Sequence, residues 1–304
     1  MTIIAMRSLL IISSLHLGAG FMAPPVLQSQ SAQRHPSSCP KTSLAAISIC
    51  TFDESDFAGK QGDWPYTAAD LNRLDNSVDT VFYDTPRFVT HIDDGAISSL
   101  KSFYQEEFTS LNKDSLDVLD LCSSWISHLP EEGIKYGKVV GVGMNEGELA
   151  ENKQLTEYVV QNLNENPTMS QFEDNSFDVI CNVVSVDYLT KPLEIFQEMN
   201  RILRPGGISL MSFSNRCFPT KAIAMWLQAD DIGRLTIVGS YYNYSGKWAS
   251  IEALDLKVKQ ATPARPSAAS LFTNPALGLA WMTSASAVAK NNQGDPMFVV
   301  KGVK

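Results

Sequence analysis

Small polar side chains gather directly after an apolar run in the middle of the chain. The run 116–121 contains Asp120 near its end and is followed by Cys122, Ser123 and Ser124. Serine hydroxyls can cap a helix and donate hydrogen bonds, and a carboxylate can accept them. No obvious acid/base pair accompanies them. The cluster therefore points to ligand binding and positioning, and no catalytic residue is assigned.

Two further apolar runs end in candidate ligand-binding amides. Asn145 follows the run 138–143, and Asn162 lies at the end of a weaker run, 158–163. The side-chain oxygen of Asn162 could accept a hydrogen bond from an amine.

Another run, 208–213, precedes side chains that could meet a second molecule. Its candidates are Asn215, Arg216, Cys217 and Lys221. Arg216 or Lys221 would bind an anionic group, or would be ordinary surface charge. Cys217 is either a nucleophile or a small buried thiol.

These positions require a parallel sheet, because the carboxyl ends of parallel strands meet at one edge and form the ligand site there. Strand signals alternate with helix signals, which predicts crossover connections. The expected strands are 116–121, 138–143, 158–163, 177–184, 208–213, 235–242 and 297–303, and the expected helices cover 96–108, 192–203 and 221–228. The sequence thus predicts an α/β fold with a mostly parallel, seven-stranded sheet and helices on both faces.

The segment before the first helix carries His91, Asp93 and Asp94. Their spacing suits no standard metal site, so capping of the helix is the preferred interpretation and no metal is predicted. The stretch 87–91 could also form a lid over a ligand. Further along, Trp125 would either stack on a ligand or fill the ligand's space.

Three stretches in order resemble class I S-adenosylmethionine (SAM) methyltransferases of type 11. They are Val-Leu-Asp-Leu at 118–121, the stretch 172–181 around Phe-Asp-Val, and the stretch 196–207 that ends in Leu-Arg-Pro-Gly-Gly. The segments 86–94 and 214–222 resemble uncharacterised methyltransferase-like proteins of cyanobacteria and plastids.

The resemblance implies a Rossmann-like fold, SAM as cofactor and a small-molecule acceptor. It implies that SAM contacts Asp120, Cys122, Ser123, Ser124, Asn145 and Asn162. The family turn D-x-G-x-G-x-G has lost its glycines here, which Cys122, Ser124 and Ile126 replace. The acidic residue expected after the second strand aligns with Gly143, so Asn145, Glu146 or Glu148 would replace it.

The charge distribution argues against nucleic acid as a partner. Residues 1–52 contain no Asp or Glu and only three Lys or Arg, so the rest of the chain carries 21 Lys and Arg against 33 Asp and Glu. Such an acidic body repels phosphate backbones. The five cysteines form no C-x-x-C pair, which favours a reducing compartment.

The N-terminus has the composition of a targeting sequence. Residues 1–20 combine Arg7, a short apolar stretch and a small-residue cleavage site, as a signal peptide does. Residues 21–51 are acid-free and rich in Ser, Ala and Pro, as transit peptides are. Together they resemble a bipartite plastid presequence, with secretion as the alternative.

The mature chain is then expected to have an irregular arm at 52–83 and a methyltransferase-like domain at 84–304. Within it, 261–294 is rich in Ala, Ser and Pro and is expected to be a loop or hairpin insertion. Pro275 and many polar residues argue against a membrane span there, while contact with a membrane surface stays open.

Three functions are compatible with these residues. The first is a SAM-dependent methyltransferase acting on a small or lipid-like acceptor in the plastid. The second is a catalytically inactive methyltransferase fold that serves as a binding or assembly factor, which the lost glycines motivate. The third, a dehydrogenase on a similar fold, has little support, because Gly141 and Gly143 lie within a strand and the third glycine is absent.

Overall fold

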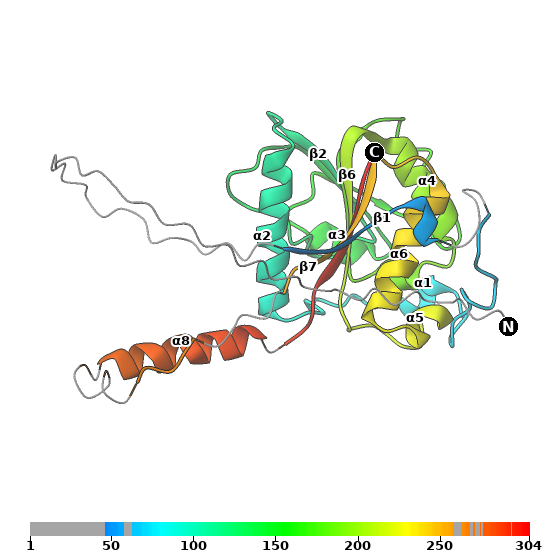
Figure 1. Cartoon of the computed structure of the whole chain (residues 1–304). Coiled ribbons are helices and arrows are strands. Elements are labelled where there is room, and N and C mark those ends of the chain that lie inside the picture. Colours follow the sequence, from blue (N-terminus) through cyan, green and yellow to red (C-terminus); the bar gives the residue numbers. More distant parts are fainter. Residues whose placement is uncertain are drawn as a thin grey trace, which may run out of the picture. The chain divides into compact units, whose positions relative to one another are not determined.

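An eight-stranded mixed sheet organises the protein (Figure 1). The computed structural model describes residues 46–57, 63–257, 263–267, 270, 274, 276–292 and 294–304. The predicted presequence lies outside these residues except for its last six positions. The strands are β1 Ile47–Phe52, β2 Leu116–Leu121, β3 Tyr136–Gly143, β4 Glu157–Val160, β5 Phe177–Val183, β6 Leu203–Phe213, β7 Ser250–Asp255 and β8 Phe298–Val303.

The strand order defines where a ligand can bind. The order is β1-β7-β8-β6-β5-β2-β3-β4. Within it, the five neighbouring strands β6, β5, β2, β3 and β4 run parallel. The remaining pairings, β6 with β8, β8 with β7 and β7 with β1, are antiparallel. The chain reverses its direction of winding beside β2, which has β3 on one side and β5 on the other. Such a switch point leaves a crevice at the carboxyl ends of the strands.

Helices cover both faces of the sheet. Those described are η1 Glu54–Asp56, α1 Asp79–Phe82, α2 Asp94–Ser110, α3 Glu146–Glu151, η2 Val186–Tyr188, α4 Pro192–Ile202, α5 Ala224–Gln228, α6 Asp231–Ser245 and α8 Ala276–Asn292. Figure 1 shows α2 on one side of the sheet and α4 with α6 on the other. Across the described ranges, no helix is long and apolar enough to cross a membrane.

Alternation along β2 creates two separate cores. Leu116 and Val118 face α2, whereas Leu119 and Leu121 belong to the core under α4 and α6. This period-2 pattern is what a strand buried on both faces requires.

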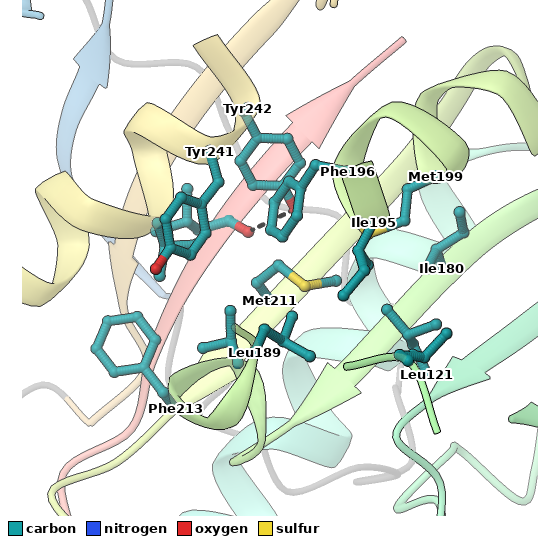
Figure 2. Packing of buried hydrophobic residues seen from close by; sticks show 14 of the residues in the cluster. Leu121, Ile180, Leu189, Ile195, Phe196, Met199, Met211, Phe213, Tyr241 and Tyr242 are labelled. Carbon is teal, nitrogen blue, oxygen red and sulfur yellow. Dashed lines mark hydrogen bonds between the residues drawn. The ribbon is translucent and has the colours of Figure 1, made fainter. Parts of the chain in front are cut away.

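The core under α4 and α6 is rich in aromatic side chains. In Figure 2, Tyr241 and Tyr242 of α6 lie against Phe196 of α4, and the ring centroids of Phe196 and Tyr242 are 4.8 Å apart. These two tyrosines thus pack α6 against α4 in the core on this face of the sheet.

The fold class is as predicted, but β1, α6, β7 and α8 differ from the prediction. The sheet has eight strands rather than seven. The expected strand 235–242 lies within α6, whose residues are buried almost continuously from Leu235 to Ser245. A helix that is apolar on all sides shows no helical periodicity, so its β-branched and aromatic residues imitate a strand.

The edge of the sheet and the insertion account for the other differences. β1 pairs with β7, so residues 47–51, which the sequence placed in the presequence, form part of the sheet. The true penultimate strand is β7. The segment 261–294, expected to be a loop or hairpin, contains the 17-residue helix α8.

Candidate functional site

A cavity of about 310 Å³ opens at the carboxyl ends of the parallel strands. This lies at the low end of the usual range for small-molecule sites. Four strand-end loops and the N-terminal arm line it. The loops contribute Asp120, Cys122, Ser123, Ser124, Ile126, His128, Met144, Asn145, Glu148, Asn162, Leu163, Asn164, Val183, Val184, Ser185, Tyr188 and Leu189. The arm, which in the structure continues through residues 84–93 up to α2, contributes Asp79, Tyr83, Arg87, Val89, Thr90 and His91. The segment after β6 contributes Arg216, Cys217 and Phe218.

Strained backbone concentrates around this cavity. Among the described non-glycine residues, six have positive φ, and four of those six line the cavity: His91 at 63°, Cys122 at 58°, His128 at 55° and Val184 at 44°. Positive φ is unfavourable for residues with a Cβ and is exceptional for a branched side chain such as valine. Because strain of this kind clusters at functional sites, the cavity is the candidate site on backbone geometry alone.

The turn after β2 keeps its left-handed backbone without the glycine. Cys122 stands at the first glycine position of the expected motif and has the positive φ that glycine would adopt easily. Burial raises the pKa of the Cys122 thiol to about 12, and Asp120 contributes further. The thiol is therefore neutral and serves as a small wall residue of the cavity.

Asp120 holds this turn together. Its Oδ2 accepts hydrogen bonds from Ser123 Oγ at 2.5 Å and from Ser127 Oγ at 2.6 Å. Asn152 then donates to Ser127 Oγ and to the Ser124 carbonyl. Burial raises the pKa of Asp120 to about 6, although both hydroxyls oppose the shift. The serines thus rigidify the turn from within.

The end of β3 cannot carry the acidic side chain that the resemblance implies. A Cβ at Gly143 would lie 2.2 Å from the carbonyl oxygen of Ser123, closer than any side chain allows. The Ser123 amide also donates to Val142 O at 2.8 Å, which holds the turn against the strand. The carbonyl of Ser123, in the turn after β2, occupies the space that an acidic side chain at position 143 would need.

Glu148 brings a carboxylate into the cavity from α3 instead. Its Oε2 accepts from Ser124 Oγ at 2.5 Å, and its Oε1 accepts from the Arg87 amide at 2.6 Å. A carboxylate has about four acceptor sites, so about two remain for a ligand. The sequence offered Glu148 only as one of three substitutes, because nothing in the sequence shows which residue of α3 faces inward.

The two candidate amides line the cavity but are partly used within the protein. Asn145 caps α3 by accepting from Glu148 N at 3.0 Å, and its Nδ2 donates to the carbonyls of Tyr83 and Asp84. The oxygen of Asn162, expected to accept from a ligand amine, accepts from Asn164 N at 3.0 Å.

Of the second-molecule candidates, Arg216 and Cys217 line the cavity, and Asn215 and Lys221 do not. Arg216 Nε pairs with Asp295 at 2.7 Å. Burial raises the pKa of Cys217, so this thiol is no ready nucleophile. Asn215 is exposed and is not among the residues that line the cavity.

Lys221 requires a correction, because it neither binds an anionic ligand nor lies on the surface. Its side chain is 0% exposed, and its Nζ lies 3.1 Å from Asp75 and 3.3 Å from Asp79. Asp79 also pairs with Arg73 at 2.7 Å. The ion pairs of Lys221 thus hold the arm against the segment after β6. The sequence alone suggested a surface lysine, because the acids that pair with it, Asp75 and Asp79, lie far away in the sequence.

The arm residues at 87–91 reach the cavity as a lid would. Trp125 lies outside the cavity, with its Nε1 donating to the Val89 carbonyl at 3.0 Å. Asp93 caps α2 by accepting from Ala96 N at 2.8 Å. Within the described part of the chain, no group of three or more His, Cys, Asp or Glu residues could hold a metal ion.

Comparison with known proteins agrees with this architecture. Residues 122–211 match the family model described as a methyltransferase domain. The strand order β4-β3-β2-β5-β6 corresponds to positions 3-2-1-4-5 of the doubly wound α/β fold. Residues 122–211 are therefore similar to a methyltransferase domain, and they lie in a Rossmann-like α/β fold.

Curated relatives match over a shorter stretch. The chain is 31% identical over 102 residues to a demethylmenaquinone methyltransferase of Bacillus cereus (strain ATCC 10987 / NRS 248), covering 31% of this chain and 43% of the relative. A Bacillus anthracis demethylmenaquinone methyltransferase (strain CDC 684 / NRRL 3495) is 30% identical over the same length. The chain thus spans less than half the length of these relatives.

Among solved structures, phosphoethanolamine N-methyltransferase 2 of Haemonchus contortus is 17% identical, with a TM-score of 0.39, covering 66% of this chain and 52% of that chain. A SAM-dependent methyltransferase of Archaeoglobus fulgidus is 13% identical, with a TM-score of 0.41, covering 68% and 94%.

Proposed function

We propose that this protein is a SAM-dependent methyltransferase acting on a small acceptor. The observation that carries the proposal is a cavity with strained backbone at the switch point of the sheet. It is lined by the loops that follow the parallel strands β2, β3, β4 and β5. One end of the cavity borders the turn after β2, where the family holds its cofactor. The other borders the arm and the segment after β6, which leaves room for a second molecule.

The residues present fit the cofactor, although they differ from the family pattern. The carboxylate of Glu148 can take the ribose hydroxyls, because two of its acceptor sites are free and no side chain fits at Gly143. Asn162 still offers its amide nitrogen to a ring-nitrogen acceptor of the adenine. The sulfonium would supply an already activated methyl group, so the protein's task is alignment, which can lower a barrier by several kcal/mol.

The acceptor end favours a flat ring. Tyr83, Tyr188 and Phe218 line it together with Arg87. The curated relatives are named for demethylmenaquinone, a ring compound, which supports an aromatic acceptor here. A lipid-like tail on that acceptor is compatible with the exposed Phe88 and Val89 beside the cavity.

The first experiment measures binding of S-adenosylhomocysteine to the domain by calorimetry and thermal unfolding. Ligand at about 100 times Kd adds about 2.7 kcal/mol to stability, which corresponds to a rise in Tm of about 5–10 °C. Glu148→Gln should weaken binding about 10–100-fold, because it removes a charged hydrogen-bond acceptor. The matched control is Glu146→Gln, on the same helix but exposed and outside the cavity, which should bind as the wild type does.

A second candidate function rests on two features: the absence of glycine from the turn after β2, and the Ser123 carbonyl that leaves no room for a side chain at Gly143. Both features would also result if the fold had become a binding or assembly factor without catalysis. Absence of any thermal shift at saturating S-adenosylhomocysteine would favour that function and overturn the proposed one.

We also infer that the chain is sorted to a plastid, which the acid-free N-terminal segment supports. Because β1 begins at Ile47, a presequence that leaves the sheet complete must be removed before that residue. Residues 1–46 fused to a fluorescent protein should direct it to plastids in an algal cell with complex plastids. Fluorescence in the secretory pathway or the medium would contradict the inference.

A further inference from the structure

Every histidine in the described part of the chain lines the candidate cavity. The chain has four histidines, and His16 and His35 lie before the described residues. The other two, His91 and His128, come from different segments, and both have positive φ. Neither belongs to the turn, the carboxylate or the amides that would hold a cofactor, so the proposed function leaves them without a role.

His91 lies on the acceptor side of the cavity. It is exposed at the edge of the arm, and its ring meets Phe218 edge-on at 5.7 Å. Arg87 lies over the same Phe218 ring at 5.6 Å, and Tyr188 packs against that ring at 6.1 Å. The imidazole is thus held beside an aromatic wall and a cation, with access to solvent.

The protonation state of His91 suits a base. Partial withdrawal from water lowers the pKa of His91; Glu148 opposes this and Arg87 adds to it. The imidazole is therefore neutral at pH 7 and can accept a proton. No described residue hydrogen-bonds to its ring nitrogens.

His128 is the weaker candidate of the two. It is 3% exposed, and its Nδ1 has no hydrogen-bond partner among the described residues. Burial lowers its pKa to about 4, and Lys101 and His91 contribute. A group this hard to protonate can orient a ligand through a hydrogen bond but takes up a full proton poorly.

We propose that His91 is a catalytic residue that accepts the proton from a ring hydroxyl of the acceptor. This inference rests on the proposed function. The oxygen lone pair forms the new bond to the methyl carbon, and the carbon–sulfur bond breaks with its electron pair passing to sulfur. The hydroxyl proton goes to a ring nitrogen of His91, which releases it to solvent at the cavity mouth. Arg87 stabilises the developing negative charge on the oxygen.

The test uses 4-nitrophenol, a ring hydroxyl compound that turns yellow on ionisation. It is added at pH 7 to the protein, free and loaded with S-adenosylhomocysteine, and the absorbance of unbound 4-nitrophenol at the same pH is subtracted. We expect a yellow band that saturates with protein concentration. In His91→Asn the band should be lost, and asparagine is chosen because it tolerates positive φ. Glu146→Gln, which is exposed and outside the cavity, should keep the band, and the unfolding midpoint of each variant shows whether it is folded.

The outcomes separate the two proposals. Failure to bind S-adenosylhomocysteine overturns the proposed function, and the free protein still reports on His91. Absence of the band in both wild-type samples overturns the assignment of a proton-accepting site. A band of equal strength in folded His91→Asn shows that another group takes the proton.

Discussion

Asp79→Asn is expected to lower the free energy of unfolding by about 3–5 kcal/mol, because it leaves the buried Arg73 without its ion-pair partner and leaves Lys221 with Asp75 alone. Asp79 is 3% exposed and pairs with Arg73 at 2.7 Å and with Lys221 at 3.3 Å. Its second oxygen accepts from Asn164 Nδ2 at 2.9 Å. Asparagine keeps the shape and one acceptor but removes the charge that pairs with Arg73 and that Lys221 shares with Asp75.

The size of the loss depends on which partner is removed. Lys221→Met leaves Asp79 paired with Arg73, so it should cost less than Asp79→Asn. Denaturant unfolding measures both, and the double variant should be more stable than the sum of the two losses predicts, because the residues share one network. Asp84→Asn, exposed on the same arm, is the control and should change stability by less than about 0.5 kcal/mol. A loss for Asp79→Asn no larger than this control would contradict the role of the network.

This cluster also explains how the arm reaches the site. The arm's backbone is tied to the segment after β6 by Asp75 N to Thr220 O, Ala224 N to Asn72 O and an isolated bridge between Arg73 and Ile223. Asp79 and Tyr83 then line the cavity. Loosening the ion network should therefore expose one wall of the site to solvent.

The buried parallel strands could be predicted from the sequence, whereas the edges and the helix α6 could not. The run 116–121 coincides with β2 because burial on both faces keeps leucine or valine at four of its six positions. β7 has a half-exposed pattern and no such signal. Within α6, the nearly continuous burial from Leu235 to Ser245 removes the polar face by which a helix is recognised.

The sequence could predict only those site residues that directly follow a parallel strand, because ligands bind at the carboxyl ends of such strands. That rule located Asp120, Cys122 and Ser123, which follow directly from the position of β2. It could not show that the Ser123 carbonyl closes the end of β3, since this depends on a contact between two loops. The rule for strand ends does not reach His91, which the sequence offered only within a possible lid at 87–91, because ion pairs distant in sequence set the path of the arm.

Asp187→Asn is expected to stabilise the protein at pH 7 by up to about 4 kcal/mol and to leave it unchanged near pH 4. Asp187 is 2% exposed in η2, and its Oδ2 has no hydrogen-bond partner among the described residues. Burial raises its pKa to about 8, and Arg234 only partly opposes this.

The sign follows from proton binding. Between about pH 4 and pH 8 the folded protein keeps the proton on Asp187, whereas the unfolded chain loses it. Folding must then take up a proton, so this residue makes the protein less stable as the pH rises, and the effect levels off above about pH 8. Asparagine does not titrate and has nearly the same shape.

The measurement is the difference in unfolding free energy between Asp187→Asn and the wild type from pH 4 to pH 8.5. Other groups cancel in this difference, including Asp120, whose raised pKa gives a slope of the same sign at lower pH. Asp114→Asn, exposed and outside the cavity, should give a flat line near zero. A constant difference for Asp187→Asn would show that the carboxyl is already ionised in the folded state. A difference that rises with pH would show that the protein retains a destabilising acid directly before Tyr188, a residue of the cavity wall. Retention of such an acid is expected where stability is sacrificed for a site.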